Sequence, residues 1–284
     1  MGDPAQLVSW LRLLDDESSV VQEALSKEFY VYGPDLMTDL AALRNGPDEA
    51  AIAEIQRLID WERKRVLRQA WQAWLADDDE GADSARLEAV FSMVATFQNG
   101  PEYGVTLSTL LDGLAEEFRL RGGTVDEETL ARFLFKEKGL EGDRSNYYHP
   151  QNSNLVNVIE TRRGLPISLA CIYMLVGHRF GFDIGGCNWP NHFYARTRQQ
   201  HVLVLVDCFN GGRTMDRESF LKLQGPSREA AEAIVDKAAS VEAIVGRVLG
   251  NLARAYQEAA HEEDSQLMLE LLQALEGRSG AQRA

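Results

Sequence analysis

Three stretches within residues 146–212 decide the fold: NYYHPQNSNLVNVIETRRGLPISLACIYMLVGHRFG (146–181), NWPNHFYAR (188–196) and LVDCFNGG (205–212). The first contains an almost wholly apolar run, which predicts a buried helix. The other two predict neighbouring strands, one with a histidine and the other with an aspartate. A helix followed by a His strand and an Asp strand is the layout of a cysteine-type catalytic triad, in which a thiolate lies at a helix N-terminus beside an imidazole.

The histidine and the aspartate are His192 and Asp207, which lie 15 residues apart. If their strands form a hairpin centred between Gln199 and Gln200, the two residues face each other directly. Their Cβ atoms would then be about 4.5–5.5 Å apart on one face, so we expect a hydrogen bond between them. Because Gln-Gln is a poor two-residue turn, a longer loop about the same centre is the alternative. A half-buried histidine beside a strand-end aspartate, without chemistry, also fits the spacing.

The apolar helix begins at Pro166, whose missing N–H costs nothing at the first helical position. Cys171 lies in the second turn of this helix, where a core role is expected. Cys208 follows the aspartate and should point to the opposite face of its strand. Cys187 and Ser168 are therefore the remaining candidate nucleophiles, although Ser168 also suits a capping or backbone hydrogen bond.

Composition excludes several classes of function. The chain has 284 residues and a formal net charge of −15, which argues against binding a nucleic-acid backbone or an anionic membrane surface. Its three cysteines show no CxxC spacing, so we expect neither a disulfide framework nor a metal site, and no cofactor. The N-terminus lacks the features of a signal peptide, and no segment reaches about 18 uninterrupted apolar residues. A cytoplasmic protein is expected.

The N-terminal part is predicted to be helical over residues 5–75. One apolar stripe at helical spacing is followed by an acidic turn and a second helix, for which Ser19 and Gln22 fit a capping box. This pair resembles a single HEAT-type repeat, although a solenoid needs about three units to be stable. A long helix is expected over 49–75. The residues of the stripe are Leu7, Trp10, Leu11 and Leu14.

The rest of the chain alternates between helices and a small group of strands. The acidic segment 76–84 predicts a linker, and Asp126 is a candidate N-cap. Helices are expected at 85–97, 105–121, 126–138, 153–161, 166–180, 230–239, 241–260 and 265–275, and strands at 183–187, 192–197 and 202–207.

Four motifs in order resemble the transglutaminase-like superfamily, and more closely its bacterial SirB-type branch, whose domain also occurs in some eukaryotic F-box proteins. The resemblance covers residues 146–212, fits the flanking helices loosely, and does not cover the N-terminal hundred residues. The motifs are YHPQNSNL (148–155), RGLPISL (163–169), PNHF (190–193) and DCFNGG (207–212).

The resemblance assigns roles to particular residues. In active members of the superfamily a G-x-C motif opens the helix, and the His and Asp strands follow. His192 and Asp207 match the last two triad positions, whereas Pro166 falls on the cysteine position. The SirB-type branch commonly has G-[IL]-P-I-S there, so the proline looks like a feature of the branch. The resemblance therefore implies a remnant or atypical triad.

We therefore predict an α+β protein with a transglutaminase-like (papain-like) core, in which a central buried helix packs on an antiparallel sheet. The predicted regions are a helical, HEAT-like N-terminal region (1–80), the core (85–225), and C-terminal helices forming a shortened repeat-like tail (226–284).

Two functions are weighed for this fold. The leading hypothesis is a non-catalytic scaffold that binds a protein partner, and the alternative is a hydrolase or acyl transferase that uses His192 and Asp207 without a cysteine. An enzyme needs an open cleft with His192 at its floor, whereas in a scaffold Trp189 or Tyr194 can fill the cleft. Whether the protein is an enzyme stays open, but a conventional transglutaminase or cysteine protease is not expected. Neither the partner nor the oligomeric state is determined by the sequence.

Overall fold

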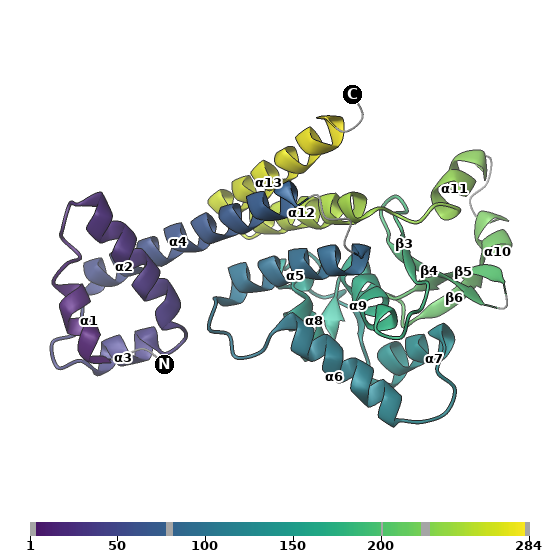
Figure 1. The fold of residues 1–284 in the computed structure, drawn as a ribbon, viewed down its shortest axis with the longest axis horizontal. Coiled ribbons are helices and arrows are strands. Elements are labelled where there is room, and N and C mark those ends of the chain that lie inside the picture. The colour runs from purple at the N-terminus through teal and green to yellow at the C-terminus, as the bar shows by residue number, and fades with distance from the viewer. Residues whose placement is uncertain (1–3, 78–81, 200, 223–227, 282–284) are drawn as a thin grey trace. The chain divides into compact units, whose positions relative to one another are not determined.

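The computed structural model describes residues 4–77, 82–199, 201–222 and 228–281, and its chain divides into two compact units (Figure 1). The first unit comprises Met1–Asp77 and Met93–Gly104, and the second comprises Asp78–Ser92 and Val105–Ala284. The predicted domain boundaries near residues 80 and 225 fall outside the described residues.

The first unit is a helical assembly around its own apolar core. Its helices are α1 (Pro4–Leu11), α2 (Ser19–Tyr32), α3 (Leu36–Ala42), α4 (Glu49–Ala76) and the C-terminal part of α5 (Asp83–Asn99). The predicted stripe is buried at Leu7 and Leu14. Trp10 at the edge of this core packs edge-on against Phe29 with ring centroids 5.5 Å apart. The helix pair is therefore confirmed, while its likeness to a HEAT repeat stays a prediction.

The predicted capping box at the start of α2 is wrong. Ser19 is already helical, and Ser18 before it makes no side-chain cap. The Gln22 side chain instead donates to the carbonyls of Leu14 and Asp16 at 3.0 and 2.9 Å. It thereby fastens α2 to the preceding turn, an arrangement that local pattern alone does not specify.

The second unit is built around α9, which is the predicted central helix. All of its residues except Met174 and His178 are buried, because it packs against α6, α7 and α8 and against the strands β3 and β4. The helices of this unit are α6 (Leu107–Leu120), α7 (Glu127–Arg132), α8 (Leu155–Thr161), α9 (Pro166–His178), α10 (Arg217–Lys222), α11 (Arg228–Val235), α12 (Val241–Glu258) and α13 (Glu262–Ala281).

One antiparallel sheet holds the strands that follow α9. Its order is β3 (Gly185–Cys187), β4 (Tyr194–Gln199), β5 (Val202–Asp207) and β6 (Arg213–Asp216). A separate, two-stranded parallel sheet is formed by the two-residue strands β1 (Glu141–Gly142) and β2 (Arg163–Gly164). The α+β class and the buried helix on an antiparallel sheet are therefore confirmed.

Several element bounds differ from those predicted. Asp126 caps α7 as expected, with a capping box to Thr129, but the helix changes to a π-helical turn over Phe133–Glu137. The strand β6 and the helix α10 were not predicted, because residues 213–222 are mostly polar and exposed. At the C-terminus α13 continues to Ala281, beyond the expected end at 275, and α12 packs along it.

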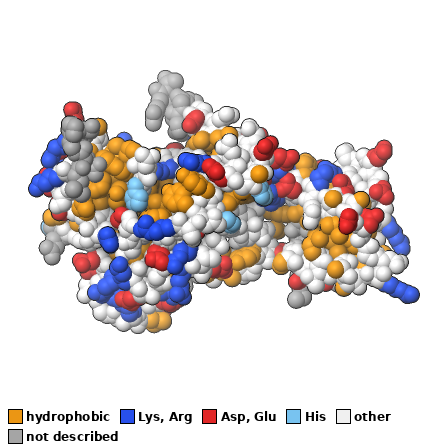
Figure 2. Space-filling view, turned by 180° about the vertical axis from the view of Figure 1, so that it is seen from behind, with side chains coloured by type: hydrophobic (Ala, Val, Ile, Leu, Met, Phe, Trp, Pro, Cys, Tyr) orange, Lys and Arg blue, Asp and Glu red, His pale blue; other side chains and the backbone are white. Residues whose placement is uncertain are grey.

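The surface of the protein mixes acidic and basic side chains, as Figure 2 shows on one face. Many exposed arginines are paired with neighbouring carboxylates, for example Arg228 with Glu232 at 2.9 Å. Within the described part of the chain, no helix is both long and apolar enough to cross a membrane.

Candidate functional site

His192 and Asp207 form a hydrogen-bonded pair, as predicted. The Nε2 atom of His192 lies 3.0 Å from the Oδ1 atom of Asp207, and about a fifth of each side chain is exposed. The predicted register is wrong, however, because Ala195 pairs with Val206 and the hairpin is shifted by two residues. The pair forms nevertheless, because His192 lies before β4 and its imidazole reaches Asp207 at the end of β5. Of the predicted Gln199-Gln200 turn, Gln200 lies outside the described residues.

His192 lies in a turn just before β4 rather than on the strand. Asn191 has a left-handed backbone with φ of 60°, a conformation that asparagine tolerates better than most residues. The backbone N–H of His192 donates to the carbonyl of Trp189 at 3.2 Å. The PNHF motif is therefore a turn that directs the imidazole toward the end of β5.

The DCFNGG motif fixes the carboxylate of Asp207. The backbone and side-chain nitrogens of Asn210 donate to its two oxygens at 3.2 and 2.7 Å. Gly211 and Gly212 have φ of 75° and 71°, which favours glycine, and the N–H of Gly212 returns to the carbonyl of Asp207. Burial raises the pKa of Asp207, but the hydrogen bonds from His192 and Asn210 outweigh it, so the pKa is lowered. The aspartate is ionised at neutral pH.

This pair determines the tautomer of the imidazole. An ionised carboxylate only accepts hydrogen bonds, so Nε2 of His192 carries the proton and Nδ1 of the neutral ring is left as an acceptor. Within the described residues no hydrogen bond involves that Nδ1 atom. The Tyr194 ring packs on the imidazole with centroids 4.4 Å apart. The arrangement can accept a proton from a group in front of Nδ1.

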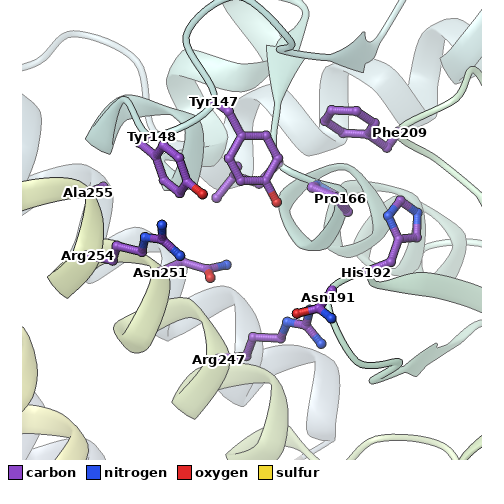
Figure 3. Close-up of a pocket in the computed structure, with 11 residues that line it drawn as sticks. Tyr147, Tyr148, Pro166, Asn191, His192, Phe209, Arg247, Asn251, Arg254 and Ala255 are labelled. Atoms are coloured by element: carbon purple, nitrogen blue, oxygen red, sulfur yellow. The ribbon is translucent and has the colours of Figure 1, made fainter. Parts of the chain in front are cut away.

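No thiol occupies that position. Cys171, Cys187 and Cys208 are each 0% exposed. Burial raises the pKa of Cys187 to about 11, and burial also raises the pKa values of Cys171 and Cys208 well above the usual thiol range. Ser168 is also buried, and its hydroxyl donates to the carbonyl of Asn152 at 2.7 Å. The serine thus makes the backbone hydrogen bond expected for it, while Pro166 lines the cavity beside His192 (Figure 3).

The YHPQNSNL motif orders the loop of residues 143–149, which carries Tyr147 and Tyr148 and is called the tyrosine loop. Asn152 is 3% exposed, and its amide nitrogen donates to the carbonyls of Asn146 and Tyr147 at 2.7 and 3.2 Å. The backbone carbonyl of Asn152 accepts hydrogen bonds from the hydroxyl of Ser168 and from the N–H of Leu165 at the start of α9. Asn152 therefore ties the tyrosine loop, through its side chain, to the helix that carries Pro166, through its backbone.

The loop and the end of β5 also share an aromatic cluster. Phe209 packs edge-on against Tyr147 at 6.0 Å and against His192 at 6.2 Å between ring centroids. A Cβ atom on Gly142 would lie 2.4 Å from the Phe209 ring, so glycine is required there. Because Phe209 touches both, the tyrosine loop and the imidazole are held on one wall of the same cavity.

The cavity is open and measures about 580 Å³. One side of the cavity is lined by His192, Pro166 and Asn191, and the tyrosine loop contributes Tyr147 and Tyr148. Trp189 and Tyr194 do not fill it, because both rings pack on Phe220 with centroids 5.0 and 5.3 Å away. The cleft thus meets the geometric condition set for an enzyme and is equally able to hold a ligand.

The opposite wall comes from α12 and was missed by the sequence analysis. Arg247, Asn251 and Arg254 project from this helix toward the tyrosines and His192 (Figure 3). Their i, i+4, i+7 spacing places them on one face of the helix. That spacing was visible in the sequence, but nothing local indicated that this polar face meets the PNHF and YHPQNSNL motifs.

The two arginines differ in their surroundings. Arg247 is half-buried and donates to the Asn188 side chain and, at 2.7 Å, to the carbonyl of Trp189. Burial lowers its pKa, and nearby Tyr147 partly opposes that effect, but a guanidinium remains charged. Arg254 is exposed and lies over the Tyr148 ring, 4.3 Å from its centroid. Both hold positive charge at the cleft.

A metal role receives no support from the side chains present. Among the residues that the structure describes, no group of three or more His, Cys, Asp or Glu side chains is arranged to hold a metal ion.

The fold and the His–Asp pair define a transglutaminase-like domain, and the comparisons with known proteins agree. Residues 105–250 match the family model described as the transglutaminase-like superfamily. Because this match covers just over half of the sequence, the chain belongs to that superfamily.

Curated relatives share this part of the chain. A UPF0162 protein of Xylella fastidiosa (strain Temecula1) is 36% identical over 132 residues, which are 44% of this chain and 47% of that protein. A UPF0162 protein of Pseudomonas aeruginosa is 33% identical over 142 residues, 48% of this chain and 52% of that protein. F-box only protein 21 of Mus musculus is 24% identical over 147 residues, 49% of this chain and 23% of that protein. The chain thus spans about half the length of the bacterial relatives, and no solved structure matches it.

Proposed function

We propose that this protein is a non-catalytic member of the transglutaminase-like superfamily, of the SirB-type branch, that uses its cleft to bind a protein partner. The observation that carries the proposal is Pro166 at the N-terminus of α9, facing the same cavity as His192. A proline has neither a nucleophilic atom nor an N–H to offer an oxyanion. The three thiols are buried, and their raised pKa values oppose formation of a thiolate at neutral pH.

The proposal gives the remaining motif residues structural roles. Asp207 and Asn210 order the turn after β5, and Asn152 orders the tyrosine loop. The cleft stays open to about 580 Å³, which suits a partner's side chains or a chain end. We also propose the cytoplasm as its compartment, because its cysteines are all unpaired thiols.

A thiol placed at the proline tests the proposal directly. In Pro166→Cys the new side chain would stand at the start of α9 beside His192, where a depressed thiol pKa is expected. Iodoacetamide near pH 6 should then label that position fast, and Pro166→Cys/His192→Ala should be slow. The unaltered chain should be slow at all three native cysteines, and Leu120→Cys on the exposed face of α6 gives the rate of an ordinary surface thiol.

Rapid labelling of a native cysteine would contradict the proposal. If Cys187 in the unaltered chain reacts fast near pH 6 and His192→Ala abolishes the reaction, a functional thiol–imidazole pair exists from a different strand. Equal, slow rates for Pro166→Cys and Leu120→Cys would instead mean that the proline is not at a nucleophile position.

The alternative is a cysteine-independent hydrolase or acyl transferase. The observation that favours it is the free Nδ1 atom of His192 in an open cleft, held by the ionised Asp207. Such an imidazole can take a proton from a water that attacks an ester or amide carbonyl. Turnover of a panel of peptide esters and amides, abolished by His192→Ala at an unchanged melting temperature, would favour this function over a binding module.

A further inference from the structure

The charge of the cleft is opposite to that of the chain. Among its described lining residues the permanently charged side chains are Arg247 and Arg254, and no Asp or Glu takes part. The whole chain carries a formal net charge of −15. A cationic cleft in an acidic protein attracts an anionic group while the remaining surface repels it, which favours a defined orientation on binding.

Arg247 has hydrogen-bonding partners but no counter-ion. Its partners are neutral oxygens, those of the Asn188 side chain and the Trp189 carbonyl. Within the described residues no carboxylate lies within ion-pair distance of its guanidinium. A half-buried charge with only neutral partners is stabilised further by an anion, and a guanidinium has five N–H groups, enough to keep these bonds and bind a carboxylate.

Several other polar groups that face the cavity lack hydrogen-bond partners within the described part of the chain. They include the hydroxyls of Tyr147 and Tyr148 and the side-chain amide of Asn251, for which the structure records no hydrogen bond. Figure 3 shows these groups directed into the cavity between the loop and α12. Arg254 is oriented by the Tyr148 ring, and its contact with Glu258, at 3.8 Å, is between exposed groups and is weak.

The spacing along α12 matches an extended peptide. Arg247 and Arg254 are seven residues apart, a distance of about 10 Å along a helix axis. A peptide in the polyproline II conformation covers about 9 Å in three residues, and its three-residue turn places the side chains of residues i and i+3 on the same face. Asn251 lies between them, where its amide can pair with a peptide unit in both directions.

We propose that the cleft recognises an acidic peptide segment, in which two carboxylates about three residues apart bind Arg247 and Arg254 and the intervening backbone meets Asn251. The inference rests on the proposed function, because it names what the binding module binds. The tyrosines flank the segment, in keeping with the enrichment of Tyr and Arg at protein interfaces. Guanidinium groups also bind phosphate, so competition by inorganic phosphate is included in the test.

Fluorescence anisotropy with defined peptides tests the inference on the full chain. The probes are fluorescein-labelled Gly-Glu-Ala-Ala-Glu-Gly amide, its Gln counterpart, and Gly-Ala-Glu-Ala-Ala-Ala with a free C-terminal carboxylate. We expect the Glu peptide to bind at least tenfold more tightly than the Gln peptide and more weakly as salt rises. The third probe distinguishes a chain-terminal carboxylate from a second acidic side chain.

Matched arginine variants locate the binding. Arg254→Gln and Arg247→Gln should each weaken binding of the Glu peptide about tenfold. Arg132→Gln on α7, which removes the same charge from an exposed position outside the cleft, should leave it unchanged. Because Arg247 also bonds to the Trp189 carbonyl, its variant counts only if the melting temperature is retained, whereas the exposed Arg254 is free of that concern.

The remaining outcomes would refute either the recognition of an acidic peptide or the non-catalytic function. Equal binding of the Glu and Gln peptides, no binding of any probe, or competition by millimolar inorganic phosphate as strong as by unlabelled Glu peptide would each refute recognition of an acidic peptide. Equal binding of both peptides would leave the binding module intact. Cleavage of the Glu peptide that His192→Ala abolishes would overturn the non-catalytic function and leave carboxylate recognition standing.

Discussion

The buried side-chain amide of Asn152 is predicted to contribute substantially to the stability of the second unit. Asn152→Ala removes a donor that reaches the carbonyls of Asn146 and Tyr147 at 2.7 and 3.2 Å, and the carboxylate of Asp143 at 3.3 Å. Two N–H groups shared among three acceptors in a buried site correspond to about 2–3 kcal/mol of unfolding free energy. The backbone carbonyl of Asn152 keeps its two bonds in the variant.

Hydrogen exchange measured by mass spectrometry resolves the effect. The slowest amides of α9 report unfolding of the second unit and should lose about 2–3 kcal/mol of protection. Amides of the 143–149 loop should exchange faster still, because their local anchor is gone. Binding of the acidic peptide should weaken as well, since Tyr147 and Tyr148 lose their fixed position.

Asn157→Ala is the matched control. The same change in α8 removes one hydrogen bond, to the carbonyl of Gln151 at 3.2 Å, and gains roughly 0.5 kcal/mol of helix propensity. Its protection should change by less than about 1 kcal/mol. If Asn152→Ala shifts α9 protection by less than about 0.5 kcal/mol and the loop amides exchange as before, the reasoning about this motif is refuted.

Two further predictions concern the core and the pair. Leu169→Ala or Ile172→Ala, both 0% exposed in α9, should cost about 2–5 kcal/mol in unfolding free energy, and a change below about 1 kcal/mol in denaturant titration would show the helix to be peripheral. Asp207→Asn removes a carboxylate whose pKa is lowered in the folded state by His192. The stability that this carboxylate contributes is complete above its unfolded-state pKa of about 3.9. It is lost as the pH falls through the lower folded-state pKa. The gap between the two chains in thermal melts should therefore close as the pH falls below about 4, and a gap that stays unchanged down to about pH 2.5 would contradict the assigned role.

Elements with a strong local signal could be predicted from the amino-acid sequence. The apolar run after Pro166 required burial on nearly every side, and α9 is enclosed as expected. Asp126 specified a helix start, and the structure shows it as the N-cap of α7, where it forms a capping box with Thr129. The spacing of His192 and Asp207, with the family motif, was sufficient to predict their hydrogen bond even though the register was two residues off.

The residues that face the His192–Asp207 pair could not be predicted in this way, because long-range packing places them there. Hairpin register depends on the turn and on sheet neighbours, which a symmetric reading of two strands does not contain. The polar face of α12 has the same appearance in the sequence as any solvated helix face. Arg247 and Arg254 line the cleft because the packing of the second unit brings α12 opposite Tyr148, His192 and the proline that begins α9 (Figure 3). The partners of a polar side chain depend on packing between residues that are distant in the sequence, so the local sequence does not specify them.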